Sequence, residues 1–266
     1  MAGPRCKICA AETVFHGSGT VMGKHEARYF ACPRCGFVSV EDPYWLAEAY
    51  SSPIADVDLG SVWRAYRYSR SVKALINLCG FDRGGKFLDY GGGFGIFVRQ
   101  MRDLGYDFRY YDSYCENLFA RGFDADIEGT ERFEMLTTFE VFEHLQDPLG
   151  TLERLASLTS TIVFSTAVIP SPAPKIGDWW YYLPVTGQHV SFYSHRSLEI
   201  IAERFNMRSY SHGKEIHMLS SKAIPEPLFR LVSSPRLAKW LDLFMPGQTL
   251  LYRDFDSGID RAGTAG

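Results

Sequence analysis

The stretch that decides the fold class is Asp89-Tyr90-Gly91-Gly92-Gly93-Phe94-Gly95, which directly follows the strand-like run Lys86-Phe87-Leu88. Glycine has no Cβ, so alternating glycines let a strand turn sharply into a helix while a ligand lies close to the backbone. Residues 96–101 (IFVRQM) predict the opening of that helix. A strand, a glycine turn and a helix in this order indicate a nucleotide-binding α/β fold.

The spacing of the glycines excludes one class of nucleotide ligand. A dinucleotide-binding turn of the form G-x-G-x-x-G needs a small third residue at position 96 or 98. The chain has Ile96 and Val98 there. The turn therefore favours a ligand other than a nicotinamide or flavin dinucleotide.

An acidic residue follows the turn at a distance that suits a ribose. The aromatic, alternating run Phe108–Asp112 predicts a buried second strand. It ends on Asp112, whose carboxylate at the strand tip can accept hydrogen bonds from both hydroxyls of a ribose. The alternative is a surface aspartate at a strand end.

A third motif lies in residues 133–148, which read FEMLTTFEVFEHLQDP. Together the three motifs resemble those of the class I S-adenosylmethionine-dependent methyltransferases of the small-molecule type, where similar E-V-x-E-H-x-x-D-P text follows the fourth strand. The Asp/Asn-Pro-Pro-aromatic loop of nucleic-acid amino-methyltransferases is absent from that position. The resemblance covers roughly residues 60–220.

This resemblance implies the fold and the cofactor. It implies an α/β domain with a Rossmann-like seven-stranded methyltransferase sheet, completed by a buried strand at 161–168 and antiparallel edge strands at 207–210 and 216–220. It also implies S-adenosyl-L-methionine as cofactor. The residues that we expect to bind it are Asp89, Gly91, Gly93, Gly95, Asp112 and Phe139.

Two histidines are candidate catalytic residues. Methylation of an O- or N-nucleophile requires loss of a proton, which a histidine can accept near pH 7. His144 follows the predicted fourth strand, and its position carries a catalytic histidine in some sugar O-methyltransferases that the chain resembles; the alternative is a helix-capping residue. His189, in residues 187–194 (GQHVSFYS), is a base, a substrate contact or a loop-ordering residue. Glu143 and His217 are weaker candidates.

Four cysteines form two C-x-x-C pairs, Cys6 with Cys9 and Cys32 with Cys35. Each pair can present two thiolates to one tetrahedral Zn²⁺, and four thiolates leave no open position, so the expected zinc is structural. Disulfides are the alternative. Residues 1–45 are therefore expected to form a zinc ribbon, with short strands at Phe30 and at residues 37–38. Binding of nucleic acid by the ribbon, and its docking on a partner protein or a substrate, both stay open.

The composition and net charge of the chain limit the partners and the cellular location that we expect. The chain has 266 residues, a net charge of −3 and 46% hydrophobic residues. This charge gives no reason to expect nucleic acid or an anionic membrane as partner. No apolar run approaches the roughly 18 residues of a membrane span, and the N-terminus lacks the apolar stretch of a secretory signal. We expect a cytoplasmic protein.

The expected domains are a zinc ribbon (residues 1–45), a linker with an N-terminal helix from Val62 to Cys79 (46–85), a cofactor-binding methyltransferase domain (86–222) and a helical extension with a flexible tail from Ser257 (223–266). Proline at residues 43 and 53 predicts a hinge in the linker. The insertion at 170–184, rich in proline and aromatic residues, either shapes an acceptor pocket or covers the sheet.

The expected activity is transfer of a methyl group to a hydroxyl of a small molecule or glycan, in polysaccharide or natural-product biosynthesis. One alternative is C-methylation of a nucleotide-linked sugar, by enzymes that share a zinc ribbon but have a further large C-terminal domain. An alternative of another class is a non-catalytic cofactor-binding scaffold whose ribbon docks a partner. A third is methylation of protein or RNA guided by the ribbon.

Overall fold

The computed structural model describes residues 2–51, 59–212, 216–245 and 247–264. The chain divides into two compact units. The first unit comprises residues 1–57 and 138–223, and the second comprises residues 58–137 and 224–266. The hinge predicted at Ser52-Pro53 lies outside the described residues, and the predicted domain boundaries stay a prediction.

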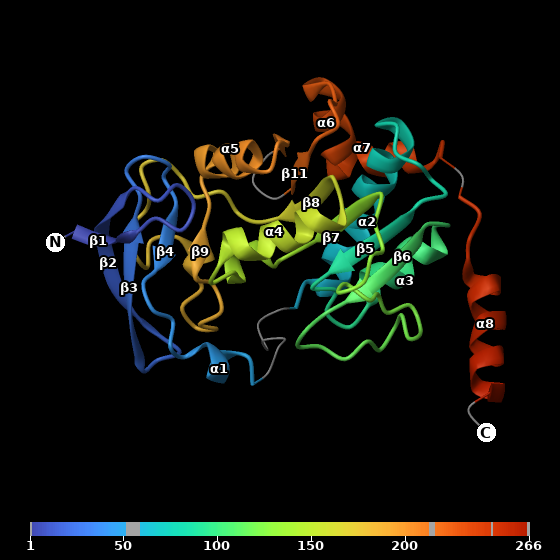
Figure 1. Cartoon of the computed structure of the whole chain (residues 1–266), viewed down its shortest axis with the longest axis horizontal. Helices are drawn as coiled ribbons and strands as arrows, with labels where there is room; N and C mark the ends of the chain where they lie inside the picture. Colours follow the sequence, from blue (N-terminus) through green and yellow to red (C-terminus); the bar gives the residue numbers. More distant parts are fainter. Residues whose placement is uncertain (1, 52–58, 213–215, 246, 265–266) are drawn as a thin grey trace. The chain divides into compact units, whose positions relative to one another are not determined.

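The second unit contains the predicted strand–turn–helix. Strand β5 (Lys86–Tyr90) pairs in parallel with β6 (Asp107–Tyr111) and with β7 (Met135–Thr138). Phe87 and Leu88 of β5 are fully buried, as a strand covered on both faces requires. Helix α3 (Ile96–Asp103) follows the glycine turn, and α2 (Ser61–Leu78) confirms the helix predicted at 62–79 to within one residue. Because the strands are parallel, β5, β6 and β7 end at the same edge (Figure 1).

The first unit contains an antiparallel sheet with the order β1-β2-β3-β4-β9. Its strands are β1 (Ala2–Arg5), β2 (Glu12–Val21), β3 (His25–Ala31), β4 (Val38–Val40) and β9 (Ser191–Phe192). The short strands predicted near residues 30 and 38 are therefore present. Strand β9 lies about 150 residues further along the chain than β4 yet pairs with it, Val38 opposite Phe192 (Figure 1).

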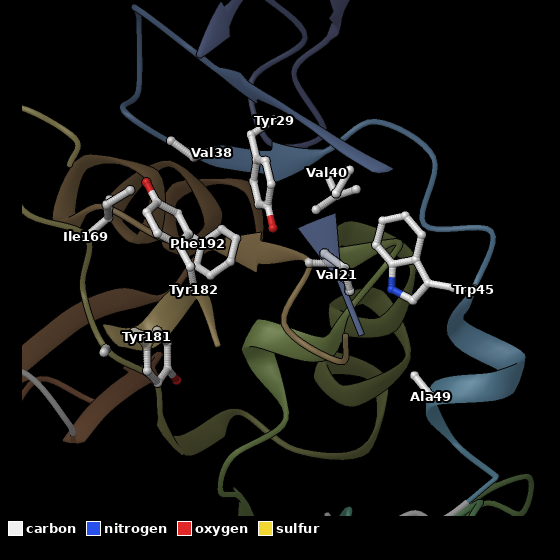
Figure 2. Packing of buried hydrophobic residues seen from close by; sticks show 13 residues of the cluster. Val21, Tyr29, Val38, Val40, Trp45, Ala49, Ile169, Tyr181, Tyr182 and Phe192 are labelled. Atoms are coloured by element: carbon white, nitrogen blue, oxygen red, sulfur yellow. The ribbon is translucent and has the colours of Figure 1, made fainter. Parts of the chain in front are cut away.

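A cluster of buried apolar residues holds the first unit together (Figure 2). Tyr29 and Val38 of the ribbon pack there with Phe192 of β9 and with Tyr181 and Tyr182 of the proline-rich insertion. The two tyrosines belong to the short helix η2 (Trp180–Tyr182), and both are buried. Within this insertion they cover the sheet, whereas Trp180, which directly precedes them, is 73% exposed.

The other elements of the first unit follow the predicted order. They are α1 (Leu46–Ala49), η1 (Phe142–His144), α4 (Pro148–Leu158), β8 (Thr161–Ser165), α5 (His195–Arg204), β10 (Arg208–His212) and β11 (Ile216–Ser220). The Ser194 hydroxyl accepts from the Ser197 amide and caps α5. Strands β10 and β11 are antiparallel, which confirms the predicted edge strands.

The methyltransferase sheet has six described strands, in the order β10-β11-β8-β7-β5-β6, where seven were predicted. Beyond β6 a single parallel bridge joins Tyr110 to Asp124. The Tyr110 amide donates to the Phe123 carbonyl, and the Ala125 amide donates to the Tyr110 carbonyl, both at 2.8 Å. Residues 124–132 (DADIEGTER) are mostly acidic or small and have low strand propensity. The pairing therefore stops after one bridge, and no seventh strand forms among the described residues.

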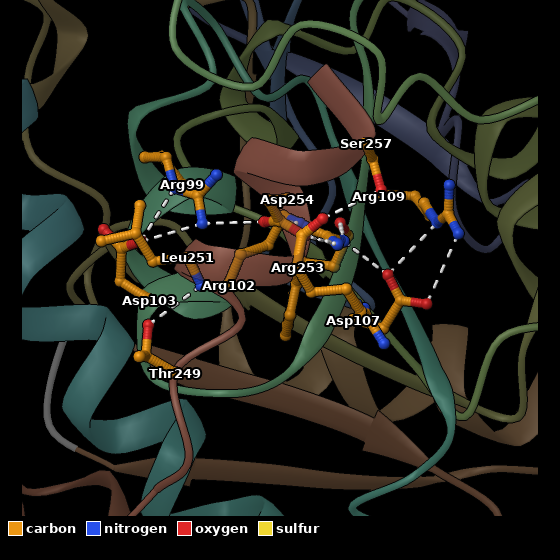
Figure 3. Close-up of polar contacts among 11 residues, drawn as sticks. Arg99, Arg102, Asp103, Asp107, Arg109, Thr249, Leu251, Arg253, Asp254 and Ser257 are labelled. Atoms are coloured by element: carbon orange, nitrogen blue, oxygen red, sulfur yellow. Dashed lines mark hydrogen bonds and ion pairs between the residues drawn. The ribbon is translucent and has the colours of Figure 1, made fainter. Parts of the chain in front are cut away.

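Three helices close the second unit, α6 (Glu226–Ser233), α7 (Pro235–Asp242) and α8 (Leu251–Thr264). Residues 257–264, predicted to be a flexible tail, are helical, because Asp254 anchors α8. Its carboxylate accepts from Arg102 at 2.7 and 2.8 Å and from Arg99 at 2.9 Å (Figure 3). The apolar side chains of α7 are largely exposed, with Leu237 45% and Trp240 67% exposed. No helix in the described ranges is long and apolar enough to cross a membrane.

Candidate functional site

The glycine turn has the backbone conformation that its sequence predicts. Gly91, Gly93 and Gly95 all have positive φ, between 56° and 84°. A Cβ built on Gly95 would lie 2.7 Å from the Asn117 side chain, so this position has no room for a side chain. A Cβ built on Gly93 would meet no atom of the described ranges within 4 Å. The backbone at Gly93 therefore borders open space, where a ligand can approach it closely.

Asp112 lies at the end of β6 and bonds to the turn. One carboxylate oxygen accepts from the Gly93 amide at 2.9 Å, and the other accepts from the amides of Tyr114 and Cys115 at 2.7 and 2.8 Å. These three bonds order the loop around the carboxylate. A carboxylate can accept about four hydrogen bonds, so Asp112 keeps capacity for a hydroxyl. Its role toward a ribose stays a prediction.

Asp89 lies beneath the turn and is 3% exposed. Its carboxylate accepts from the Thr137 hydroxyl at 2.6 Å. Burial raises the pKa of Asp89 to about 7, and the nearby Asp112 carboxylate adds to the rise, while the Thr137 hydrogen bond opposes it. The sequence indicated the position of this acid but not its raised pKa.

The four ribbon cysteines converge on one point in the first unit. Their sulfur atoms all lie within 4.8 Å of one another. Cys6 Sγ lies 3.6 Å from Cys35 Sγ, and Cys9 Sγ lies 3.5 Å from Cys32 Sγ. A tetrahedral Zn²⁺ with bonds of 2.3 Å holds its sulfurs about 3.8 Å apart. The four thiols therefore fit zinc, and none of them is in a disulfide.

Backbone pairing brings the two candidate histidines together in the first unit. The Val190 amide donates to the Glu143 carbonyl at 2.8 Å, and the Ser191 hydroxyl donates to the Leu145 carbonyl at 2.6 Å. These bonds fix the segment that precedes β9 against η1. His144 and His189 are next to these bonds, and their ring centroids lie 5.1 Å apart.

The ribbon and the residues after it hold the same segment from the other side. The Trp45 indole donates to the Gly187 carbonyl at 2.8 Å, and the Gln188 amide donates to the Ala49 carbonyl at 3.0 Å. The Val40 amide donates to the Val190 carbonyl at 3.0 Å. The position of His189 therefore depends on the fold of residues 38–49.

Both imidazoles have defined partners. His189 Nδ1 lies 2.7 Å from the Tyr181 carbonyl oxygen. A carbonyl only accepts, so Nδ1 carries the proton and Nε2 carries the lone pair. His144 Nδ1 lies 2.8 Å from the Tyr50 hydroxyl. Tyr50, for which the sequence gave no signal because 94 residues separate it from His144, thus belongs to this site.

The protein environment keeps both histidines neutral. Burial lowers the pKa of His144 well below its usual value, and the neighbouring His189 lowers it further. Burial lowers the pKa of His189 to about 4, against the opposing effect of the Tyr181 carbonyl. Each ring is densely surrounded, yet each residue keeps some accessible surface. That remaining surface is what a ligand can reach.

Glu143 is fully buried, and burial, together with the Glu140 carboxylate, raises its pKa to about 8. The hydroxyls of Thr166 and Tyr181 lie close enough to lower the pKa of Glu143 slightly, but neither forms a hydrogen bond of good geometry with its carboxylate. These two hydroxyls lie 3.3 Å from each other. Neither carboxylate oxygen has a hydrogen-bond partner among the residues that the structure describes.

The remaining predicted residues have simpler surroundings. Phe139 is half-buried directly after β7, where its role toward a cofactor stays a prediction. His217 is buried in β11 and bonds to the Thr166 carbonyl and to Ser211, which confirms an ordinary strand residue. Tyr110 was not singled out by the sequence, but its hydroxyl lies 2.8 Å from the carbonyls of both Gly93 and Cys115.

A protein family described as "Methyltransferase domain" matches residues 63–212, which is more than half of the chain. The chain therefore belongs to this methyltransferase family. It is an S-adenosylmethionine-dependent methyltransferase of class I, as the three sequence motifs implied. No curated protein matches the chain.

Solved structures similar to the chain include two methyltransferases. One is magnesium protoporphyrin IX methyltransferase from Synechocystis PCC 6803 with bound S-adenosylhomocysteine, at 14% identity, 65% coverage of this chain, 90% coverage of that chain and a TM-score of 0.45. The other is human N-acetylserotonin methyltransferase in complex with S-adenosylmethionine, at 13% identity, 67% and 66% coverage and a TM-score of 0.45.

Proposed function

We propose that the protein transfers the methyl group of S-adenosylmethionine to a hydroxyl of a small molecule or glycan, in polysaccharide or natural-product biosynthesis. The observation that carries the donor half of this proposal is the open space over Gly93, next to the ordered Asp112 carboxylate. Asp89, Gly91, Gly93, Gly95, Asp112 and Phe139 are the residues to which we assign the cofactor. Bound there, S-adenosylmethionine supplies an electrophilic methyl group on a positively charged sulfonium.

We assign the acceptor to the surface at His144 and His189. Their pairing through η1 and the segment before β9 fixes two neutral imidazoles side by side. A neutral imidazole nitrogen can orient a hydroxyl by accepting its hydrogen bond. In the reaction the acceptor oxygen bonds to the methyl carbon while the carbon–sulfur bond breaks, the electron pair stays on sulfur, and the hydroxyl proton leaves to His144 or to water.

We also propose that Cys6, Cys9, Cys32 and Cys35 bind one structural Zn²⁺. Four thiolates complete its tetrahedral shell, so this ion has no position for substrate or water. The ribbon sheet contacts the segment that holds His189 through the pairing of β4 with β9. Trp45 and Ala49, which follow the sheet in sequence, form hydrogen bonds to the same segment. In this proposal the ribbon positions the acceptor site. Docking of a partner protein on the surface of the ribbon is a second proposed role.

The test is a methyl-transfer assay with radiolabelled donor and a panel of sugars, glycans and hydroxylated metabolites, run beside calorimetry of cofactor binding. We expect donor binding and transfer to at least one hydroxyl. The His144→Ala variant should bind the cofactor as wild type does and lose about 10²–10⁴-fold in turnover, the range for a positioned proton-transfer group.

The alternatives give different results in the same assay. Cofactor binding without transfer to any acceptor would favour a scaffold. Product methylated on carbon would favour a sugar C-methyltransferase. Full turnover by His144→Ala would reject the assignment of the acceptor site to the histidine pair.

A further inference from the structure

The feature that the proposed methyl transfer leaves unexplained is the carboxylate of Glu143. It is fully buried, and within the described part of the chain neither of its oxygens has a hydrogen-bond partner. A buried carboxyl group with no hydrogen-bond partner is unfavourable, and its ionised form is more so, unless something compensates it. Such orphan groups in native proteins often mark a missing ion or water.

Two histidines lie close to this carboxyl group, and the three side chains have the geometry of a ligand set. One ring nitrogen from each histidine and one Glu143 oxygen lie within 4.8 Å of one another. Ligands bonded to one ion at 2.0–2.2 Å stand roughly 3–4 Å apart. Side-chain rotations that move these atoms by about 1 Å therefore suffice to place all three around one cation.

Residues behind the histidines hold them as metal ligands are usually held. A ligating histidine typically donates its other ring N–H to a carbonyl or similar acceptor, which fixes the tautomer and the ring orientation. His189 does this through the Tyr181 carbonyl, so its Nε2 lone pair is available. The Tyr50 hydroxyl on His144 Nδ1 can accept in the same way.

We propose that Glu143, His144 and His189 bind one divalent transition-metal cation, separate from the zinc of the four cysteines. Two imidazoles and one carboxylate suit Zn²⁺, Fe²⁺ or Mn²⁺, and three protein ligands leave coordination positions open. The histidines keep accessible surface through which an ion and a substrate oxygen can reach the cluster.

The role of this cation, though not its binding, rests on the proposed methyl transfer. An acceptor hydroxyl that binds at an open position loses its proton to water more readily, because the cation lowers its pKa. Two adjacent hydroxyls, as on a sugar or catechol, can occupy two open positions together. The acceptor class favoured by this cluster is therefore a compound with vicinal oxygens.

The test uses Mn²⁺ as the probe, because its free ion is measured directly by electron paramagnetic resonance and it does not compete well for four thiolates. The protein is the full chain with zinc in the ribbon, verified as one zinc per chain. We expect one bound Mn²⁺ per chain. Glu143→Gln and His189→Ala should each weaken it by at least about 100-fold, since even substitutions behind metal ligands change affinity 10–100-fold.

Tyr50→Phe tests the residue behind His144 and should weaken Mn²⁺ about 10–100-fold. The matched control is His25→Gln, which removes a histidine that contacts a carboxylate, Glu48, at 3.1 Å in the same unit. It should leave Mn²⁺ binding unchanged. Thermal unfolding and zinc content of each variant verify that the fold is intact.

Two results would overturn the metal site: no stoichiometric Mn²⁺ binding by a protein that binds S-adenosylmethionine, or Mn²⁺ binding that Glu143→Gln and His189→Ala leave unchanged. Neither result touches the proposed methyl transfer, which instead fails if the cofactor does not bind or no acceptor is methylated. The two proposals can therefore fail separately.

Discussion

The glycine turn and the histidine cluster are built in opposite ways. The turn, its supporting acids and its loop contacts all come from residues 89–120 and from Thr137 of the neighbouring strand. The histidine cluster needs Tyr50, residues 143–144, Tyr181 and His189, which the fold of the first unit brings together. A site made from consecutive residues depends on local conformation, whereas an assembled site depends on every element that holds its parts.

Because of this difference, we expect the glycine turn and the histidine cluster to respond to different substitutions. Residues 40–49 bond directly to residues 187–190, so damage to the ribbon reaches His189. The contacts of the glycine turn lie within the second unit. We therefore expect ribbon changes to affect the acceptor site and to spare cofactor binding.

The largest expected effect comes from breaking the cysteine cluster. Cys32→Ser removes one thiolate from the proposed zinc site, and small zinc-bound sheets do not fold without their metal. We expect loss of zinc, of Mn²⁺ binding and of methyl transfer, with the affinity for S-adenosylmethionine changed by less than about threefold. Zinc analysis, calorimetry and the transfer assay measure these. Cys79→Ser, in the second unit and outside both proposed metal sites, is the control, and loss of cofactor binding in Cys32→Ser would contradict the separation.

The next effect concerns the buried Asp89, whose pKa is raised to about 7 from the model-compound value of 3.8. Its protonated form is favoured by folding, so this contribution to stability is fully present below pH 3.8 and is lost as the pH rises through about 7. The difference between these two pKa values corresponds to about 4 kcal/mol. Asparagine does not ionise, so Asp89→Asn removes this loss of stability at higher pH.

Urea unfolding should therefore show Asp89→Asn gaining free energy of unfolding relative to wild type between pH 4 and pH 8, by up to about 4 kcal/mol. The exposed Asp178 provides the control, because Asp178→Asn should follow the wild-type pH dependence. Parallel curves for wild type and Asp89→Asn would show that Asp89 titrates as an ordinary carboxylate.

A smaller effect separates ligand contact from backbone strain at the turn. Gly93 and Gly23 both have positive φ, and a Cβ on either would meet no atom within 4 Å. Alanine strains each backbone by roughly 1–2 kcal/mol, but only Gly93→Ala places a methyl group where we assign the cofactor. We expect calorimetry to show about 10–100-fold weaker cofactor binding for Gly93→Ala and wild-type binding for Gly23→Ala. Equal affinities in the two variants would place the cofactor elsewhere.

The smallest expected effect comes from Tyr110, which supports the glycine turn. Tyr110→Phe removes the hydroxyl that bonds to the carbonyls of Gly93 and Cys115. A hydrogen bond of this kind contributes about 1 kcal/mol, so cofactor affinity should fall roughly fivefold. Tyr111→Phe, which removes a contact to the exposed Ser113, should leave the affinity unchanged. An unchanged affinity in Tyr110→Phe would show that the turn does not need this bond.

The sequence predicted the parts of the structure that local chemistry decides. The positive φ of Gly91, Gly93 and Gly95 and the cap at Ser194 follow from residue type, and the four cysteines follow from spacing. It overestimated the sheet by one strand, because residues 124–132, which have low strand propensity, make a single bridge to β6. It also predicted a flexible end where Asp254, bonded to Arg102 far along the chain, holds a helix.

The histidine cluster could be predicted only in part for the same reason. His144 and His189 were identifiable as residues in suggestive segments, and Glu143 was considered only as a helper of its neighbour. Nothing in the sequence indicated that Val190 bonds to Glu143, or that Tyr50 reaches His144. Long-range pairing, rather than residue type, determines which side chains of this unit meet.

The measurement that tests the central claim most directly is the affinity for S-adenosylhomocysteine, by calorimetry, of two variants. The claim is that the cofactor belongs to the glycine turn and Asp112, independently of the histidines. We predict that Asp112→Ala weakens binding by about 100-fold, through loss of a charge-assisted ribose contact and of loop order, and that the double variant His144→Ala/His189→Ala binds within about twofold of wild type. Loss of binding in the histidine variant, with normal binding in Asp112→Ala, would contradict the account.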